Sequence, residues 1–364
     1  MPQSLLLAYT AFVLLLFLGL LVLDARGLFK KHEGRHAKRK GYRPRVLVMM
    51  PCKGGDIGLY NNLRAASRQD YKNYRLVAIL DRGDPALETV ERAGVECVYS
   101  DSRCTKCSGK VRALATAMER FAGYEIYAVL DSDELVAKDW LSRLVAPFAG
   151  VHIGASVMFP LFMPIAGGFW SRTKQVWGFV GQSLMESGMA RFVDGGSFAF
   201  RASLMDRKAL SFFKNSRYSV SDDICINMIV RRSGLGIAYD RRHHPITYVD
   251  ETLATFWEWA NRQTALAIFA YRRMLYYGLA YYLSEVLVFA TGVLGAALVS
   301  PLFALLLLHA AISFAKNESR IGRDSSPLAT AAATVLLPFI YAANLAAASG
   351  TRSITWRGRR YRLH

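Results

Sequence analysis

Short apolar runs alternate with amphipathic stretches over the middle of the chain. The apolar runs have the length of β-strands and lie at Arg45–Met50, Arg75–Leu80, Glu96–Ser100 and Glu125–Leu130. The amphipathic stretches have helical spacing and lie at Leu59–Gln69, Ala86–Ala93, Gly109–Phe121 and Trp140–Phe148. Strands that alternate with helices predict an α/β fold with a wound, mostly parallel sheet. The pattern from Val151 to Phe200 is irregular, and another helix is expected near Ser221.

Long apolar blocks near both ends of the chain predict membrane segments. Ser4–Leu23 carries no charge and is long enough to span a bilayer. Positive charges follow this block instead of preceding it, which favours an uncleaved anchor with its C-terminal side in the cytosol. Two further blocks, Leu279–Phe314 and Leu328–Ala348, predict two or three C-terminal segments. Three full crossings would place the basic tail outside the cell, so we expect one of these segments to lie in the interface.

These patterns divide the chain into five segments. They predict an N-terminal transmembrane anchor (1–25), a basic juxtamembrane linker (26–44), a cytosolic α/β domain (45–275), C-terminal membrane helices (276–350) and a basic tail (351–364).

The formal net charge of +18 indicates an anionic partner or surface. The basic residues do not interleave with exposed aromatic residues as in nucleic-acid-binding proteins, so no nucleic-acid partner is expected. Many of them directly follow the first apolar block, where they suit the anionic cytosolic leaflet: Arg26, Lys30, Lys31, Arg35, Lys38, Arg39, Lys40, Arg43 and Arg45. We therefore expect an integral membrane protein. The odd number of cysteines argues against a disulfide framework, and Cys104 and Cys107 are expected to be two reduced thiols.

Acidic residues follow three of the predicted strands. Asp56 closes the segment after the first strand, Asp81 follows the second, and Asp131-Ser-Asp133 follows the strand that ends at Leu130. Ligands of a wound sheet bind beyond the carboxyl ends of its strands, so these carboxylates are expected at one edge. Asp131 and Asp133 suit Mg²⁺ or Mn²⁺, which would bridge the diphosphate of a sugar nucleotide. The alternative is that they cap the next helix.

Two other segments allow both a structural and a chemical interpretation. Asp222 and Asp223 open the helix expected after Ser221, where carboxylates favour the helix dipole. Two adjacent carboxylates also repel each other, which raises the pKa of one of them and suits a general base. In the segment Trp257–Gln263, Arg262 and two Trp residues fit an interfacial belt; alternatively, Arg262 reaches phosphate oxygens.

Several ordered stretches carry a family resemblance. The chain resembles family-2 glycosyltransferases, and among them the ceramide glucosyltransferases, from the anchor through to the tail. The stretches are Pro51-Cys-Lys-Gly-Gly-Asp56, Asn61-Asn62-Leu63, Asp70-Tyr71-Lys72-Asn73-Tyr74, Asp84-Pro85-Ala86 and Ile354-Thr-Trp-Arg-Gly-Arg-Arg-Tyr-Arg-Leu363. The resemblance implies a GT-A fold of the nucleotide-diphospho-sugar transferase type, with UDP-glucose as the favoured donor. An isoprenoid or glycerolipid acceptor fits as well as ceramide.

The resemblance also implies roles for individual residues. Asp223 takes the place of the catalytic base. Asp131 and Asp133 take the places of the residues on the side of the donor's diphosphate and metal. Ceramide glucosyltransferases generally lack the second of these carboxylates. Arg262 is the arginine of a (Q/R)-x-x-R-W motif whose other residues are changed. The remaining substrate-binding positions are Pro51, Asp81, Lys110, Gly195, Gly196 and Ser197.

The sequence thus predicts a membrane-bound, metal-dependent, inverting glycosyltransferase. It would move a sugar from a nucleotide donor to a lipid hydroxyl in a single displacement, with Asp223 as the general base. The runner-up is a processive polysaccharide synthase of the hyaluronan or cellulose type, which the few membrane segments disfavour. The third possibility is a catalytically silent protein that binds nucleotide sugar or lipid; such a protein would lack the base or the metal carboxylates, and the sequence has both.

Overall fold

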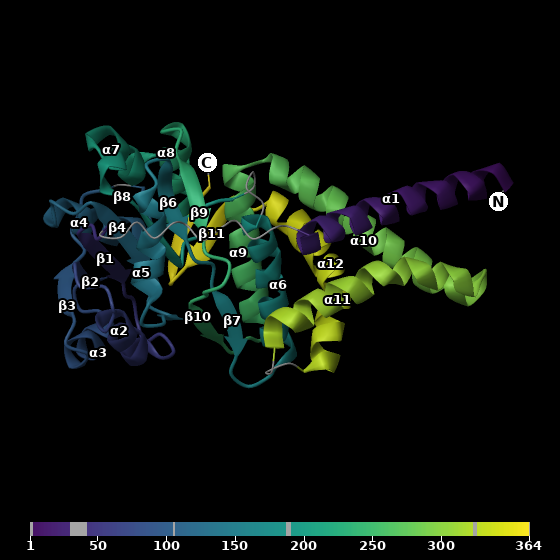
Figure 1. Cartoon of the computed structure of the whole chain (residues 1–364), viewed down its shortest axis with the longest axis horizontal. Helices are drawn as coiled ribbons and strands as arrows, with labels where there is room; N and C mark the ends of the chain where they lie inside the picture. Colours follow the sequence, from purple (N-terminus) through teal and green to yellow (C-terminus); the bar gives the residue numbers. More distant parts are fainter. Residues whose placement is uncertain (1–2, 30–41, 105, 187–190, 323–325, 364) are drawn as a thin grey trace. The chain divides into compact units, whose positions relative to one another are not determined.

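The computed structural model describes residues 3–29, 42–104, 106–186, 191–322 and 326–363. They form two compact units (Figure 1). The α/β unit comprises Glu33–Met163, Gly181–Val249 and Arg352–His364, and the helical unit comprises Met1–His32, Pro164–Val180 and Asp250–Thr351. Most of the predicted basic linker, at 30–41, lies outside the described residues.

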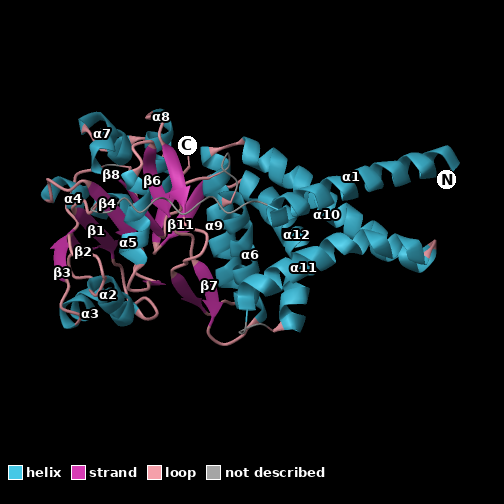
Figure 2. Ribbon diagram, viewed as in Figure 1, coloured by secondary structure: helices cyan, strands magenta, loops and turns pink. Residues whose placement is uncertain are grey.

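A seven-stranded sheet with the order β3-β2-β1-β4-β8-β6-β9 forms the centre of the α/β unit (Figure 2). The first four strands along the chain are parallel, with β1 between β2 and β4, and β8 runs antiparallel to β4. The predicted wound, mostly parallel sheet is confirmed. The strands are β1 (Val46–Pro51), β2 (Tyr74–Leu80), β3 (Glu96–Tyr99), β4 (Ile126–Leu130), β6 (Ile153–Val157), β8 (Ser197–Arg201) and β9 (Gly236–Tyr239).

Alternate residues of the central strands enter two separate cores. On β1, Val46, Val48 and Met50 pack against α2, α3 and α5, whereas Leu47 and Met49 pack against α4, α7 and α8. This two-residue period explains why strands covered on both faces read as continuous apolar runs. The helices are α2 (Leu59–Ser67), α3 (Ala86–Arg92), α4 (Gly109–Arg120), α5 (Trp140–Val145), α7 (Arg207–Asn215) and α8 (Asp222–Arg232), with the 3-10 turns η1 (Ala146–Ala149) and η2 (Ala202–Leu204).

Two smaller sheets complete the α/β unit. One has the order β5-β10-β7 and consists of β5 (Glu134–Leu135), β10 (Ile246–Val249) and β7 (Leu161–Pro164). The other is a hairpin of β11 (Ser353–Trp356) and β12 (Arg359–Arg362), which forms from the predicted basic tail.

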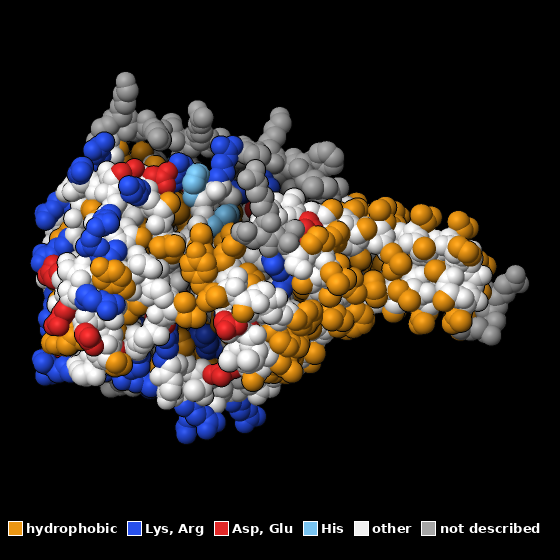
Figure 3. Space-filling view, turned by 90° about the horizontal axis from the view of Figure 1, so that it is seen from below, with side chains coloured by type: hydrophobic (Ala, Val, Ile, Leu, Met, Phe, Trp, Pro, Cys, Tyr) orange, Lys and Arg blue, Asp and Glu red, His pale blue; other side chains and the backbone are white. Residues whose placement is uncertain are grey.

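Helices and aromatic contacts build the helical unit. Its core joins Val176 and Trp177 of α6 to Phe256 of α9 and Ala333 of α12, and Trp177 stacks on Tyr341. Apolar side chains cover much of its surface in Figure 3. The elements are α1 (Gln3–Phe29), α6 (Phe169–Met185, in this unit as far as Val180), α9 (Leu253–Ala270), α10 (Arg273–Leu298), η3 (Pro301–Leu307), α11 (Leu308–Ile321) and α12 (Pro327–Ser349).

Among the described residues, three helices are long and apolar enough to cross a membrane. The candidate spans are Ser4–Leu23, Arg273–Leu298 and Pro327–Ser349. The second apolar block of the sequence therefore divides into one candidate span, the turn η3 and the shorter helix α11.

The pattern gave a correct account of the four early strands and the helices between them, with small shifts at their ends. It missed α6, because the irregular stretch after Val151 holds glycines and aromatics that have low helix propensity. Packing overrides that propensity. A Cβ at Gly181 would overlap the ring of Phe159, so the glycine lets the Phe159 ring pack closely against α6.

Candidate active site

The carboxyl ends of β1, β2 and β4 bring three of the predicted aspartates to one edge of the sheet. Asp81 directly follows β2 and Asp131 directly follows β4, while Asp56 follows β1 in a loop. The antiparallel strand β8 begins at the same edge, and the Asp131 amide donates to the carbonyl of Gly196 at 2.8 Å. The switch in strand order on either side of β1 thus places a site here, as wound sheets generally do.

Lys110, near the start of α4, contacts two carboxylates and one backbone carbonyl from three other segments of the chain. Its Nζ lies 2.6 Å from Asp131 Oδ1 and 3.2 Å from Asp222 Oδ2, and it donates to the Gly195 carbonyl at 2.7 Å. Burial alone would lower the pKa of Lys110, but Asp131 and Asp222 outweigh it and hold the pKa above its ordinary value. Lys110 is therefore a charged, buried link between Asp131 and the pair that opens α8.

Asp222 and Asp223 occupy the first turn of α8 and differ in their surroundings. Asp222 is buried and paired with Lys110, whereas Asp223 accepts hydrogen bonds from the Ser221 hydroxyl and, at 2.7 Å, from the Ile224 amide, both on Oδ1. A Cβ at Gly195 would lie 3.5 Å from Asp223 Oδ2, so this second oxygen faces the glycine pair. Burial raises the pKa of both carboxyls. A raised pKa and an oxygen directed at the start of β8 suit a proton acceptor.

Further acidic groups surround this cluster. Burial, followed by the charge of Asp223, raises the pKa of Asp194 to about 7. Burial also raises the pKa of Glu134 well above its ordinary value, and Asp131, Asp133 and Asp194 raise it further. A Cβ at Gly196 would overlap the Glu134 carboxylate, which is why the chain needs glycine where β8 begins.

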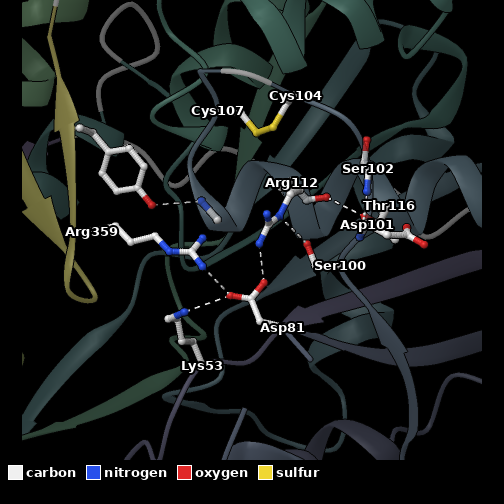
Figure 4. A network of polar contacts seen from close by, with 12 residues as sticks. Lys53, Asp81, Ser100, Asp101, Ser102, Cys104, Cys107, Arg112, Thr116 and Arg359 are labelled. Carbon is white, nitrogen blue, oxygen red and sulfur yellow. Dashed lines mark hydrogen bonds and ion pairs between the residues drawn. A yellow bond between two sulfur atoms is a disulfide. The ribbon is translucent and has the colours of Figure 1, made fainter. Parts of the chain in front are cut away.

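Asp81 accepts contacts from three cations (Figure 4). Lys53 Nζ and Arg359 Nη2 each lie 3.0 Å from its Oδ2, and Arg112 Nη2 lies 2.5 Å from Oδ1. Although burial would raise it, the pKa of Asp81 is lowered by these cations, with Lys53 contributing most. The predicted nucleotide-binding aspartate is thus ionised within an excess of positive charge.

The prediction that Cys104 and Cys107 are reduced thiols is wrong. Cys104 and Cys107 are joined in a disulfide in the loop before α4, whereas two reduced thiols were expected (Figure 4). The spacing of these residues lets the two sulfur atoms meet within one loop, and the odd cysteine count says nothing against a single local bond.

The other predicted substrate residues are placed as follows. Pro51 ends β1 and is half-buried at the site edge. Ser197 is fully buried, and its hydroxyl accepts a hydrogen bond from the Trp140 indole at 2.8 Å, so this side chain packs in the core. Arg262 lies on α9 in the helical unit.

Residues 11–364 match the family model described as glycosyl transferase family 21. The chain belongs to this family. It is therefore a glycosyltransferase, and family 21 includes the ceramide glucosyltransferases that its sequence resembles. No curated protein sequence matches the chain significantly.

Two solved structures are similar to this family-21 chain. The mannosyltransferase PcManGT from Pyrobaculum calidifontis, in complex with GDP-Man and Mn²⁺, has a TM-score of 0.58 at 19% identity and covers 94% of this chain and 99% of its own. Glucosyl-3-phosphoglycerate synthase from M. tuberculosis covers 65% of this chain and 82% of its own at 15% identity, with a TM-score of 0.43. The likeness to PcManGT shows the GT-A fold.

The carboxylates available as metal ligands in this family-21 enzyme fit a divalent cation that is shared with a substrate. No group of three or more His, Cys, Asp or Glu side chains is arranged around a metal position among the residues that the structure describes. Asp131 engages Lys110 through Oδ1, which leaves Oδ2 for another partner, and Asp133 is two residues away. Mg²⁺ is usually held by one or two carboxylates together with substrate phosphates, and this pair supplies that number.

Sequence reasoning missed several members of the site. Arg112 and Arg359 contact Asp81, and Asp194 and Glu134 lie in the acidic cluster. Asp194 directly precedes the glycine pair, so its place before a strand could have drawn attention to it. Arg112 lies two residues after Lys110 in the first turn of α4. This closeness to Lys110 is the only feature of the local sequence that points to Arg112 as a site residue.

Proposed function

We propose that this family-21 enzyme transfers glucose from UDP-glucose to the hydroxyl of a membrane lipid. One observation carries the proposal: Lys110 contacts both Asp131 and Asp222, so the donor-side carboxylates and the predicted base Asp223 belong to one cluster. The candidate membrane spans support a lipid acceptor, because the acceptor and the enzyme would share the bilayer. Ceramide is the favoured acceptor by family, with other lipid alcohols of the same chemistry as alternatives.

The proposed reaction is a single displacement with inversion. The acceptor oxygen forms a bond to the anomeric carbon while the bond from that carbon to the phosphate oxygen breaks, and Asp223 accepts the hydroxyl proton. Lys110 holds Asp131 and Asp222 in place and offsets negative charge beside the departing nucleoside diphosphate. Asp131 and Asp133 would hold Mg²⁺ or Mn²⁺, which supplies further neutralisation of the diphosphate when bound.

The path of the chain supports a topology with two C-terminal crossings. The chain leaves the α/β unit after Val249 and returns to it at Arg352, so an even number of crossings must separate these points. We propose that α10 and α12 cross and that α11 does not, which keeps the basic hairpin on the same side as the catalytic unit. With α1 as the anchor, this side is the cytosol under the positive-inside tendency.

Purified protein given UDP-glucose and a lipid extract is expected to yield lipids that carry one added hexose. Mass spectrometry of the extract identifies the acceptor, and parallel incubations with UDP-galactose, UDP-N-acetylglucosamine and GDP-mannose test the donor. A ladder of products with increasing numbers of sugars would instead support a processive synthase. Donor consumption without any glycosylated lipid would contradict the proposed acceptor class.

Metal removal is expected to abolish transfer. Chelation by EDTA should stop glucosylation, and Mn²⁺ or Mg²⁺ added in excess should restore it, because carboxylates and phosphates bind hard cations. Asp133→Ala should raise the Mn²⁺ concentration needed for half-maximal activity, whereas Asp139→Ala, which removes a surface carboxylate paired with Arg143, should not. Full activity in EDTA would exclude a metal role for Asp131 and Asp133.

A further inference from the structure

The basic C-terminal tail folds into a hairpin whose tip is an arginine in a strained turn. Trp356 pairs with Arg359, so the turn consists of Arg357 and Gly358. Both have positive φ, 50° and 75° respectively, as in a type I′ turn. Asn, Asp and Gly are the usual residues at such positions, and a bulky side chain there is uncommon. A non-glycine residue held in this conformation is a starting point for a functional hypothesis, which its side-chain contacts must support.

The arginine at the tip contacts the loop after β1 and lies beside Asp131-Ser-Asp133, called here the D-x-D motif. Arg357 Nη2 is 2.6 Å from Asp56 Oδ1, and Arg357 Nη1 donates to the Lys53 carbonyl at 3.2 Å. The other oxygen of Asp56 accepts a hydrogen bond at 2.5 Å from Ser132, which is the middle residue of Asp131-Ser-Asp133. Burial would lower the pKa of Arg357, but Asp56, followed by Asp133 and Asp131, raises it above its ordinary value.

Alternate residues of the hairpin face the site. Arg359 pairs with Asp81, and the hydroxyl of Tyr361 accepts a hydrogen bond at 3.2 Å from the amide of Gly109, the first residue of α4. Arg357, Arg359 and Tyr361 are two residues apart, which is the spacing of side chains on one face of a strand. Arg360 donates to Ser353 within the hairpin, and Arg362 is exposed. Ile354, which is 4% exposed, anchors β11 in the unit.

Cations outnumber carboxylates around Asp81. Lys53, Arg112 and Arg359 surround the single carboxylate of Asp81. Arg357 contacts the backbone of Lys53, and its partner Asp56 also accepts from Ser132. The contacts with Asp56 and Lys53 use two of the five N–H donors of the Arg357 guanidinium, which is a group suited to phosphate oxygens. A diphosphate would bring negative charge to this group of cations.

We propose that the C-terminal hairpin is part of the donor site and that Arg357 binds the diphosphate of the nucleotide sugar. Arg359 is a positioning residue in this arrangement, since it holds Asp81 in place. The inference rests on the proposed function, because it takes the donor to be a nucleoside diphosphate sugar.

Calorimetric titration of the full-length protein with UDP, in detergent and with Mn²⁺ present, tests the proposal. Uridine affinity is measured in the same samples by displacement of UDP. Arg357→Ala is expected to weaken UDP binding by about 10- to 100-fold, which is the usual effect of one lost charge-assisted hydrogen-bonded contact, and to leave uridine binding within about twofold. Arg362→Ala removes the same charge from the outward face of the hairpin and should leave both affinities unchanged.

The outcomes separate the two proposals. If wild-type protein binds neither UDP nor GDP, the proposed function and this inference both fail. If the wild type binds UDP and Arg357→Ala binds it equally well, or if UDP and uridine weaken together, Arg357 has no role at the diphosphate while the proposed function stands. Arg357→Lys keeps the charge but not the planar fork, so it provides a folded comparison if the alanine variant is unstable. It is expected to weaken UDP binding several-fold and uridine binding not at all.

Discussion

Asp223→Asn is expected to lower turnover by about 10²- to 10⁴-fold while leaving UDP affinity nearly unchanged. The amide has almost the same shape as the carboxylate, and its oxygen can still accept from Ser221 and Ile224, so the first turn of α8 should stay folded. It cannot take up the proton of the acceptor hydroxyl. Lys110 pairs directly with Asp131 and Asp222 instead of Asp223, so the donor side should keep its arrangement.

Two measurements check this expectation. Single-turnover transfer from radiolabelled UDP-glucose gives the rate of the chemical step, and UDP titration gives the donor-side affinity. Asp139→Asn is the matched control, because it makes the same chemical change at a surface carboxylate paired with Arg143 and should retain wild-type rates. Turnover of Asp223→Asn close to that of the control would remove Asp223 from the mechanism.

The sequence alone allowed prediction of the parts of the site that follow strands. Asp81 and Asp131 come immediately after apolar runs, and the wound-sheet rule places such residues at one edge without knowledge of any contact. The pair Asp222 and Asp223 was found because it opens a helix, although local sequence left its role open. Lys110 emerged through family resemblance, since nothing in its immediate neighbours separates it from other lysines of the chain.

The parts that could not be predicted depend on contacts between distant segments. Arg357 and Asp56 are joined across most of the chain, and no local periodicity records such a pairing. The tail was predicted only as a basic segment, because its composition is the same whether its arginines face solvent or carboxylates. The raised pKa of Asp194 likewise follows from burial beside Asp223, which only the assembled fold creates.

Lys110→Met is expected to destabilise the α/β unit by about 3–5 kcal/mol and to abolish transfer. Methionine fills a similar volume but leaves the carboxylates of Asp131 and Asp222 without their shared counter-charge, and the Gly195 carbonyl loses its donor. A buried carboxylate without a partner is far more costly than the pair that it replaces, because burial removes its hydration. Chemical denaturation of the purified protein measures the change.

Two further variants show whether charge, and not packing, causes this loss. Lys214→Met breaks the peripheral pair with Glu119 and should cost under about 1 kcal/mol, since that pair is close to solvent. Lys110→Met combined with Asp222→Asn removes one of the two uncompensated charges and should recover part of the stability without restoring transfer. If Lys110→Met alone were as stable as the wild type, the cluster would be open to water, and Lys110 would not be the link that joins the donor-side aspartate to the pair in α8.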